Sequence, residues 1–155
     1  MIQKIEARVS HRFRSAAESV YDAWLDPALV GEWLPCALRE MGLAGDIRAI
    51  EIDPRTGGRF LFADQRGDVE ARHWGTYLEV DRPRKIAFTW IVDAQEEADP
   101  SRVTLTIEPD PDGCVATLVH EIDAVWAEYL AQTERGWYIL LQAAGKHAEA
   151  HRPTL

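Results

Sequence analysis

Cysteine is scarce in this chain, and acidic side chains outnumber basic ones. Only Cys36 and Cys114 occur, far apart and without the spacing of a metal site. We therefore expect two reduced thiols in a cytoplasmic protein, with no metal and no cofactor. There are 17 Lys and Arg against 26 Asp and Glu, and the net charge of −9 argues against nucleic acid and anionic membranes as partners.

Long apolar runs are also missing. No stretch approaches the roughly 20 residues that a membrane-spanning helix needs. The N-terminus has no basic segment followed by an apolar run, so we expect no signal peptide. Apolar residues still make up 46% of the 155 residues, which is enough for a core. This length predicts a single domain over residues 1–155. We expect the protein to be a monomer or a homodimer.

The longest helical pattern runs from residue 126 to residue 148. Glycine inside a helix costs about 1 kcal/mol relative to alanine, so Gly136 is expected to leave room for a neighbouring element or ligand beside Trp137. Apolar side chains recur at three- and four-residue spacing, which predicts one buried stripe. They are Trp126, Tyr129, Leu130, Thr133, Trp137, Leu140, Leu141 and Ala144.

A strand and two short helices are predicted at the start of the chain. Alternation of polar and apolar residues over 5–13 predicts a half-buried strand. Ser15 is expected to begin the first helix through a capping box. Asp26 is expected to cap the second helix. Pro35 should end that helix and lead into a loop over residues 36–45.

Six consecutive strands are predicted next, joined by short turns that favour an antiparallel meander. A turn at Gly57 and Gly58 is expected to contain a residue with positive φ. A sheet with one apolar face needs a cover, which the long helix can supply. The predicted strands cover residues 47–52, 59–64, 70–80, 85–92, 102–108 and 114–122.

The hairpin at Asp81 predicts which side chains face the helix. Pairing Val80 with Ile86 and continuing the alternation sorts the neighbouring residues into two faces. The face toward the helix would carry Trp74, Thr76, Leu78, Phe88, Trp90 and Val92. The opposite face would carry His73, Tyr77, Glu79 and Thr89, with His73 exposed.

Several local motifs are similar to those of one known family. They are Asp53-Pro54-Arg55, Gly57-Gly58-Arg59-Phe60, Gly75-Thr76-Tyr77-Leu78-Glu79-Val80, Phe88-Thr89-Trp90 and Gly136-Trp137. With this order of elements, the chain resembles the activator of heat-shock protein 90 ATPase homologue family, in the SRPBCC group of the START-like superfamily. The resemblance implies an α+β helix-grip fold: a strand, two short helices, a six-stranded antiparallel meander and a long C-terminal helix packed on the sheet.

The resemblance also implies a cavity between the curved sheet and the long helix. The alternative is that the same side chains simply fill the core, as aromatic stripes at this spacing usually do. The candidate ligand-binding residues are Trp33, Phe60, Phe62, Trp74, Phe88, Trp90, His120, Trp137 and Leu141.

His120 is the polar side chain that stands out among these candidates. It shares a strand face with Leu118 and Ile122, where a neutral imidazole can orient a ligand or move a proton. The alternative is a histidine that is hydrogen-bonded inside the core or faces solvent. His147 and His151 have a spacing that suits a metal, but no third ligand is evident, so a polar chain end is expected there.

Three functions are compatible with these observations. The first is a binding module for a small hydrophobic or aromatic molecule. The second is a cyclase, dehydratase or hydrolase type of enzyme, in which His120 and either Glu51 or Asp64 carry protons. The third is a protein-interaction module with a chaperone or a regulator as partner. It ranks last because these 155 residues leave no room for the extra N-terminal domain through which eukaryotic co-chaperones of this family contact the chaperone.

Overall fold

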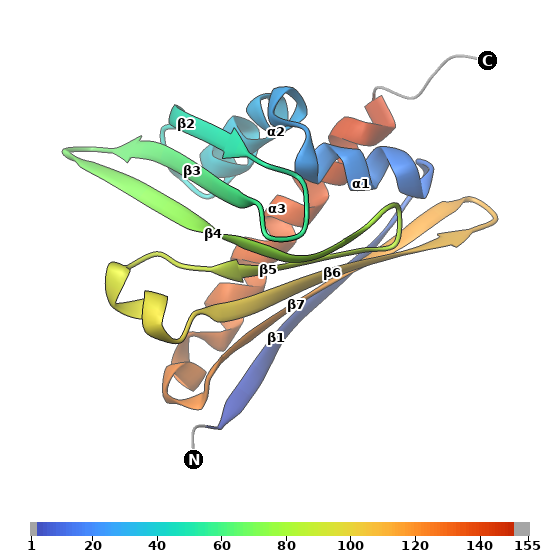
Figure 1. Cartoon of the computed structure of the whole chain (residues 1–155). Coiled ribbons are helices and arrows are strands. Elements are labelled where there is room, and N and C mark those ends of the chain that lie inside the picture. The colour runs from blue at the N-terminus through green and yellow to red at the C-terminus, as the bar shows by residue number, and fades with distance from the viewer. Residues whose placement is uncertain (1–2, 151–155) are drawn as a thin grey trace.

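The computed structural model of the protein describes residues 3–150, in which seven antiparallel strands form one sheet in the order β1-β7-β6-β5-β4-β3-β2. Strands β2 to β7 each pair with the next in sequence, which confirms the predicted meander, and β1 adds to β7. The sheet is strongly curved (Figure 1). The strands are β1 (Lys4–Phe13), β2 (Asp46–Ile52), β3 (Arg59–Arg66), β4 (Val69–Asp81), β5 (Lys85–Trp90), β6 (Ser101–Asp110) and β7 (Gly113–Asp123).

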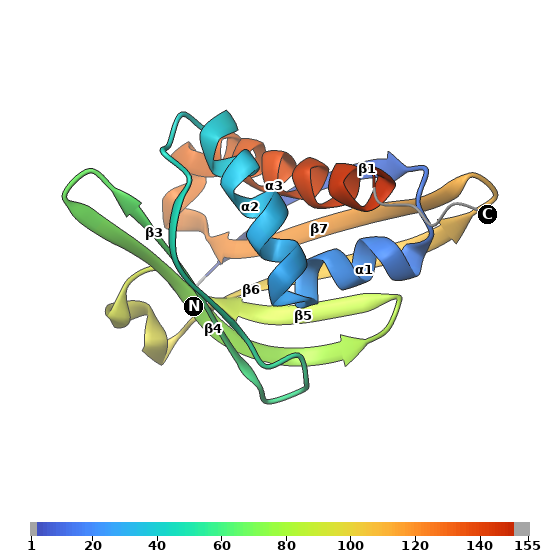
Figure 2. The same ribbon diagram turned by 90° about the horizontal axis from the view of Figure 1, so that it is seen from above.

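Helices cover the concave face of this sheet. The long helix α3 (Leu130–Ala150) crosses it, and α1 (Ala17–Leu25) and α2 (Pro27–Glu40) lie beside α3 (Figure 2). Two short 3-10 helices, η1 (Ala94–Ala98) and η2 (Ala124–Tyr129), follow β5 and β7. This arrangement is the α+β helix-grip fold that the sequence predicts. None of the helices within residues 3–150 combines the length and the apolar character required to cross a membrane.

The long helix begins later than predicted. Its first turns are replaced by η2, inside which Trp126 departs from helical dihedral angles (φ −95°, ψ 16°). Trp126 and Tyr129 are exposed, so the prediction that they belong to the buried stripe is wrong. Trp137 and Leu141 are buried, as predicted.

The predicted end of the second helix is also wrong, because α2 continues through Pro35 to Glu40. A proline inside a helix removes one backbone hydrogen bond and costs about 3 kcal/mol. The extra turn buries Ala37 and Leu38 in the apolar cluster between α2 and α3, and this packing offsets the cost. Asp26 does cap the helix, since its Oδ1 accepts a hydrogen bond from the Ala28 amide at 2.9 Å.

Ser15 does not cap the first helix. The N-cap residue is Ala16, which supplies no side-chain hydrogen bond. Ser15 is only 1% exposed, and its Oγ has no partner among the described residues. The capping-box pattern fails because α1 begins at Ala17, so Ser15 lies one residue before the N-cap position.

One extra residue in β4 changes which side chains face the helices. Val80 pairs with Ile86 as predicted, but a bulge at Leu78 then pairs Tyr77 with Phe88. Because side chains alternate along a strand, the extra residue inverts both faces of β4 before the bulge. Tyr77 is accordingly buried at 3% exposure, whereas Leu78 is exposed. The predicted faces are therefore wrong from Leu78 back to His73.

The predictions for Phe88, Thr89, Trp90 and Gly57, which do not depend on this bulge, are confirmed. Phe88 and Trp90 both reach α3, where their rings lie 6.5 Å and 4.9 Å from that of Trp137. Thr89 faces away, and its Oγ1 accepts a hydrogen bond from the backbone of β4. Gly57 has the expected positive φ, at 85°.

Candidate functional site

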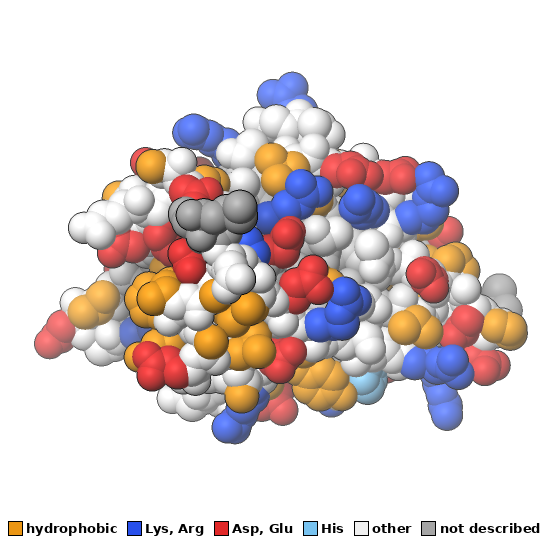
Figure 3. Space-filling view, turned by 90° about the horizontal axis from the view of Figure 1, so that it is seen from below, with side chains coloured by type: hydrophobic (Ala, Val, Ile, Leu, Met, Phe, Trp, Pro, Cys, Tyr) orange, Lys and Arg blue, Asp and Glu red, His pale blue; other side chains and the backbone are white. Residues whose placement is uncertain are grey.

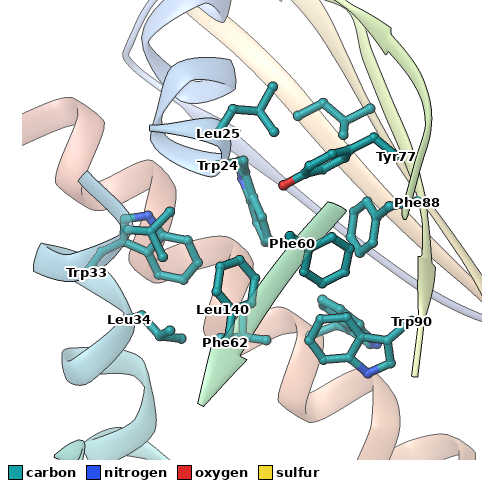
Figure 4. A pocket seen from close by; sticks show the side chains of 13 residues that line it. Trp24, Leu25, Trp33, Leu34, Phe60, Phe62, Tyr77, Phe88, Trp90 and Leu140 are labelled. Carbon is teal, nitrogen blue, oxygen red and sulfur yellow. The ribbon is translucent and has the colours of Figure 1, made fainter. Parts of the chain in front are cut away.

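A small cavity lies between the inner face of the sheet and the three helices (Figure 4). Its volume is about 40 Å³, and its walls are almost wholly apolar. An apolar cavity of about 150 Å³ accepts benzene, so this one admits an aromatic molecule only when its walls move apart. The lining side chains are Trp24, Leu25, Val30, Trp33, Leu34, Phe60, Phe62, Tyr77, Ile86, Phe88, Trp90, Trp137 and Leu140.

The structure brings most of the predicted site residues to this cavity. Leu141 is fully buried in the neighbouring core without lining the cavity, and His120 contacts Trp137 from outside it. Trp74 belongs to the outer face of the sheet. The six predicted residues that line the cavity are Trp33, Phe60, Phe62, Phe88, Trp90 and Trp137.

Phe60 of β3 lies at the centre of the aromatic wall. Its ring centroid is 5.3 Å from that of Phe62, 5.5 Å from that of Phe88 and 6.1 Å from that of Trp90. Trp90 meets Trp137 of α3 edge to face at 4.9 Å. Tilted and edge-on ring contacts contribute about 0.5–1.5 kcal/mol per pair beyond area burial. The rings therefore hold one another in place around the cavity.

His120 belongs to a hydrogen-bond chain behind this wall. The indole Nε1 of Trp137 donates to His120 Nδ1 at 3.0 Å, so Nδ1 is an acceptor. The other ring nitrogen, Nε2, lies 2.8 Å from Ser101 Oγ, and that hydroxyl donates to the Trp90 carbonyl at 2.9 Å. Since the Ser101 proton is used on Trp90, Nε2 carries the imidazole proton and donates it to Ser101. The neutral tautomer protonated at Nε2 satisfies the whole chain.

These hydrogen bonds leave His120 without a free basic nitrogen. Burial lowers its pKa from 6.5 to about 4, and a proton on Nδ1 would face the Trp137 N–H. His120 is therefore a neutral, fully hydrogen-bonded residue at neutral pH. Its geometry suits positioning Trp137 rather than taking a proton from a ligand.

A wider cleft adjoins the cavity near the start of α3. Its volume is about 410 Å³, and polar groups border it, among them His120 and the ion pair of Lys4 with Asp99. Trp90, Trp137 and Leu140 line both the cleft and the cavity. These three side chains form the wall between the two spaces.

Trp74 lies on the opposite side of the sheet from the cavity. It lines an outer hollow of about 910 Å³ with Leu61, Leu78 and Ile91, and its Nε1 donates to Glu97 at 3.1 Å. Seen from below, hydrophobic side chains gather on the left half of the molecule (Figure 3). The prediction that Trp74 lines the cavity is wrong because the bulge in β4 inverts its face.

His73, by the same inversion, faces inward instead of solvent. Its ring stacks on that of Trp90 at 5.0 Å. Burial, with a smaller contribution from the charge of Arg66, lowers its pKa to about 4. Asp64 is buried and paired with Arg66 at 2.8 Å, and Glu51 is exposed. Neither carboxylate lines the cavity, so the two predicted acidic partners of His120 do not meet it.

Among residues 3–150, no three His, Cys, Asp or Glu side chains are grouped as a metal would require. His147 is hydrogen-bonded to Glu32 of α2. His151 lies outside the described residues.

Sequence reasoning missed three wall residues that matter for the site. Tyr77 was hidden by the bulge, which no residue pattern in β4 marks. Leu140 belongs to the predicted apolar stripe of the long helix and Trp24 lies on α1, and only the crossing of α1, α2 and α3 places them at one cavity. Gly136 borders the cleft, and a methyl group there would meet nothing within 4 Å. No element approaches the helix at Gly136, contrary to one reason proposed for this glycine.

The chain matches one family model over residues 14–144, and the model is described as activator of Hsp90 ATPase homolog 1-like protein. A comparison with curated proteins finds no match. Many solved structures share the fold, among them three examples that match over almost their whole length.

A Chromobacterium violaceum protein is 25% identical, with a TM-score of 0.76 over 93% of this chain and 97% of its own. The AHSA1-like protein from Aeromonas hydrophila is 20% identical, with a TM-score of 0.75 over 97% and 99%. A Staphylococcus aureus protein of unknown function is 14% identical, with a TM-score of 0.78 over 96% of each chain. The latter two similarities show the fold alone.

Proposed function

The chain belongs to the activator of Hsp90 ATPase homologue 1-like family, and from the cavity inside its fold we propose that it binds a small hydrophobic or aromatic molecule. One observation carries this proposal. Thirteen side chains surround the cavity, most of them large and apolar, and they still leave about 40 Å³ unfilled. Natural cores are packed with few voids larger than a water molecule, so an unfilled apolar space among aromatic rings favours a guest.

The guest enters, on this proposal, through the wall of Trp90, Trp137 and Leu140. Because these side chains also line the cleft of about 410 Å³, their displacement joins the cavity to a space large enough for an aromatic molecule. Trp137 is held in the closed position by its hydrogen bond to His120. This bond contributes about 0.5–1.5 kcal/mol net, and the ring contacts of Trp137 with Trp90 and Phe88 add to it, so contacts with the guest must compensate for the displacement of Trp137.

An enzymatic role has less support than binding. Among the described residues, Tyr77 is the sole ionisable group in the cavity wall, whereas acid–base chemistry needs a positioned donor and acceptor within reach of a substrate. Both ring nitrogens of His120 are already hydrogen-bonded. A chaperone partner is compatible with the family, and stimulation of the chaperone's ATPase by the purified protein would test it directly.

Toluene binding to a pair of matched variants tests the proposal. Val30→Phe adds ring volume inside the cavity, and Val69→Phe makes the same change at a surface position that is 65% exposed. Titration calorimetry and native mass spectrometry should detect toluene in the parent and in Val69→Phe, and not in Val30→Phe. Absence of binding in the parent protein, or equal binding in all three, would overturn the proposal.

A further inference from the structure

Unused hydrogen-bond donors gather at one end of the cavity. Trp24 lines the cavity, and its Nε1 is buried without a partner among the described residues. Tyr77 lines the same end, and its hydroxyl points toward Trp24 (Figure 4). The hydroxyl of Tyr21, buried nearby in the same core cluster, also lacks a partner among these residues. A buried donor without an acceptor is costly, so this group of donors needs explaining.

The other indoles that line closed parts of the cavity are already engaged. Trp33 donates from Nε1 to the Ala23 carbonyl at 2.7 Å, and Trp137 donates to His120. Trp24 and Tyr77 therefore present unused donors at this end of the cavity, and Nε1 of Trp24 has no acceptor among the described residues. What is missing from this end of the cavity is an acceptor.

The electrostatics of this end disfavour an anion as that acceptor. Within residues 3–150, no Lys, Arg or His lines the cavity, and an ionised carboxylate buried without a cationic partner is strongly destabilised. Burial raises the pKa of Tyr21 to about 12, with further contributions from Asp81 and Asp22 that exceed the opposing one of Arg82. Burial also raises the pKa of Tyr77, with help from Tyr21 and Asp53. Both phenols keep their protons at neutral pH, and the nearby charge is predominantly negative.

We propose that the cavity selects an uncharged, largely apolar molecule with a carbonyl oxygen that accepts hydrogen bonds from Trp24 and Tyr77. A carbonyl oxygen has two lone pairs and so can accept from both donors at once. The apolar body of the guest lies against the rings of Phe60 and Phe88. This inference rests on the proposed binding function and adds the chemical class of the ligand.

Three ligands of the same size and shape separate the carbonyl from the apolar body. Acetophenone carries the oxygen, α-methylstyrene replaces it by a methylene group, and benzoate carries a charge. Titration calorimetry with the full chain should show acetophenone binding about tenfold more tightly than α-methylstyrene, as one to two net hydrogen bonds imply. Benzoate should not bind.

Two conservative variants assign the effect to its donors. In Tyr77→Phe and in Trp24→Phe, the preference for acetophenone over α-methylstyrene should fall about three- to tenfold, since this ratio cancels the effect that a changed wall has on both ligands. Tyr138→Phe removes a hydroxyl from the exposed face of α3 and should change neither affinity. The carbonyl stretching frequency of bound acetophenone gives a second measure: it should be lower than in hexane, and should rise in Tyr77→Phe.

The ligand measurements test the preference for a carbonyl group separately from the proposed binding function. Equal binding of acetophenone and α-methylstyrene, with no change in the two variants, would overturn the carbonyl inference while supporting an apolar site; a tightly held water at the donors would give this result. Tighter binding of benzoate would also overturn the inference. If neither neutral ligand binds, the proposed function itself fails and the inference fails with it.

Discussion

Trp137 donates a hydrogen bond to His120 at 3.0 Å, and this bond joins the long helix α3 to the last strand of the sheet. It links a wall residue of the cavity to a titratable group that is 6% exposed. The position of the wall and the protonation of one histidine are therefore coupled.

The first prediction follows from that coupling and concerns pH. The pKa of His120 is about 4 in the folded protein and 6.5 unperturbed, so the unfolded state binds more protons between these values. The stabilisation is fully present above about pH 6.5 and is lost as the pH falls toward 4. The loss is on the order of 3 kcal/mol at most. Urea unfolding between pH 4 and pH 8 measures it.

His73 must be separated from His120 in that measurement. Its pKa is also lowered to about 4 by burial, so it contributes in the same direction and the same window. His120→Gln should flatten part of the pH dependence, and the double variant with His73→Gln should flatten most of it. A full slope in the double variant would show that carboxylates are responsible.

Trp137→Phe should destabilise the protein by about 1–3 kcal/mol. The ring remains at the wall, but Nδ1 of His120 loses its donor and is left buried without a partner. The freed nitrogen can then take a proton, so the pKa of His120 should rise. Titration of the imidazole signals by NMR measures that pKa. An unchanged value would mean that burial alone sets it.

Two glycines of α3 should respond oppositely to the same substitution. A methyl group at Gly136 meets nothing within 4 Å, so Gly136→Ala should stabilise the protein by about 1 kcal/mol through helix propensity. At Gly145 the methyl group would approach Phe13 Cε1 to 2.1 Å, so Gly145→Ala should destabilise it. Thermal unfolding decides both, and stabilisation by the two changes alike would contradict the packing described here.

Gly57→Val should destabilise the protein by more than about 1 kcal/mol. Gly57 has a φ of 85°, which a β-branched side chain adopts only with strain. No atom would contact an added Cβ there, so the loss comes from the backbone rather than from a clash. Chemical denaturation of the variant measures the change, and a neutral result would show that the turn can rearrange.

The order of elements was predictable from sequence, because hydrophobic periodicity and turn residues are local signals. The assignment of Leu118, His120 and Ile122 to one face also holds, since β7 contains no bulge. Local signals failed where tertiary packing decides. Pro35 stays inside α2 because the residues after it are buried.

The candidate site was predictable as a set of aromatic residues but not as a chemical surface. Phe60, Phe62, Phe88 and Trp90 lie on strands whose alternation is regular, and all four reach the cavity. Both Tyr77 and Leu78 are apolar enough to face inward, so hydrophobicity alone could not choose between them. The hydroxyl donor of Tyr77 was missed for that reason.

The bulge at Leu78 thus shifts the alternation of inward and outward side chains along β4 by one residue. Without this bulge, regular pairing from Val80 onward would place Leu78 opposite Phe88 and carry the Tyr77 phenol out to the convex side, where water would saturate it. The interior would gain only a hydrocarbon in its place. Deleting Leu78 itself would instead remove the bulge and leave Tyr77 opposite Phe88, facing inward. The inward position of the phenol therefore tolerates the loss of Leu78 but not its inclusion in the regular ladder.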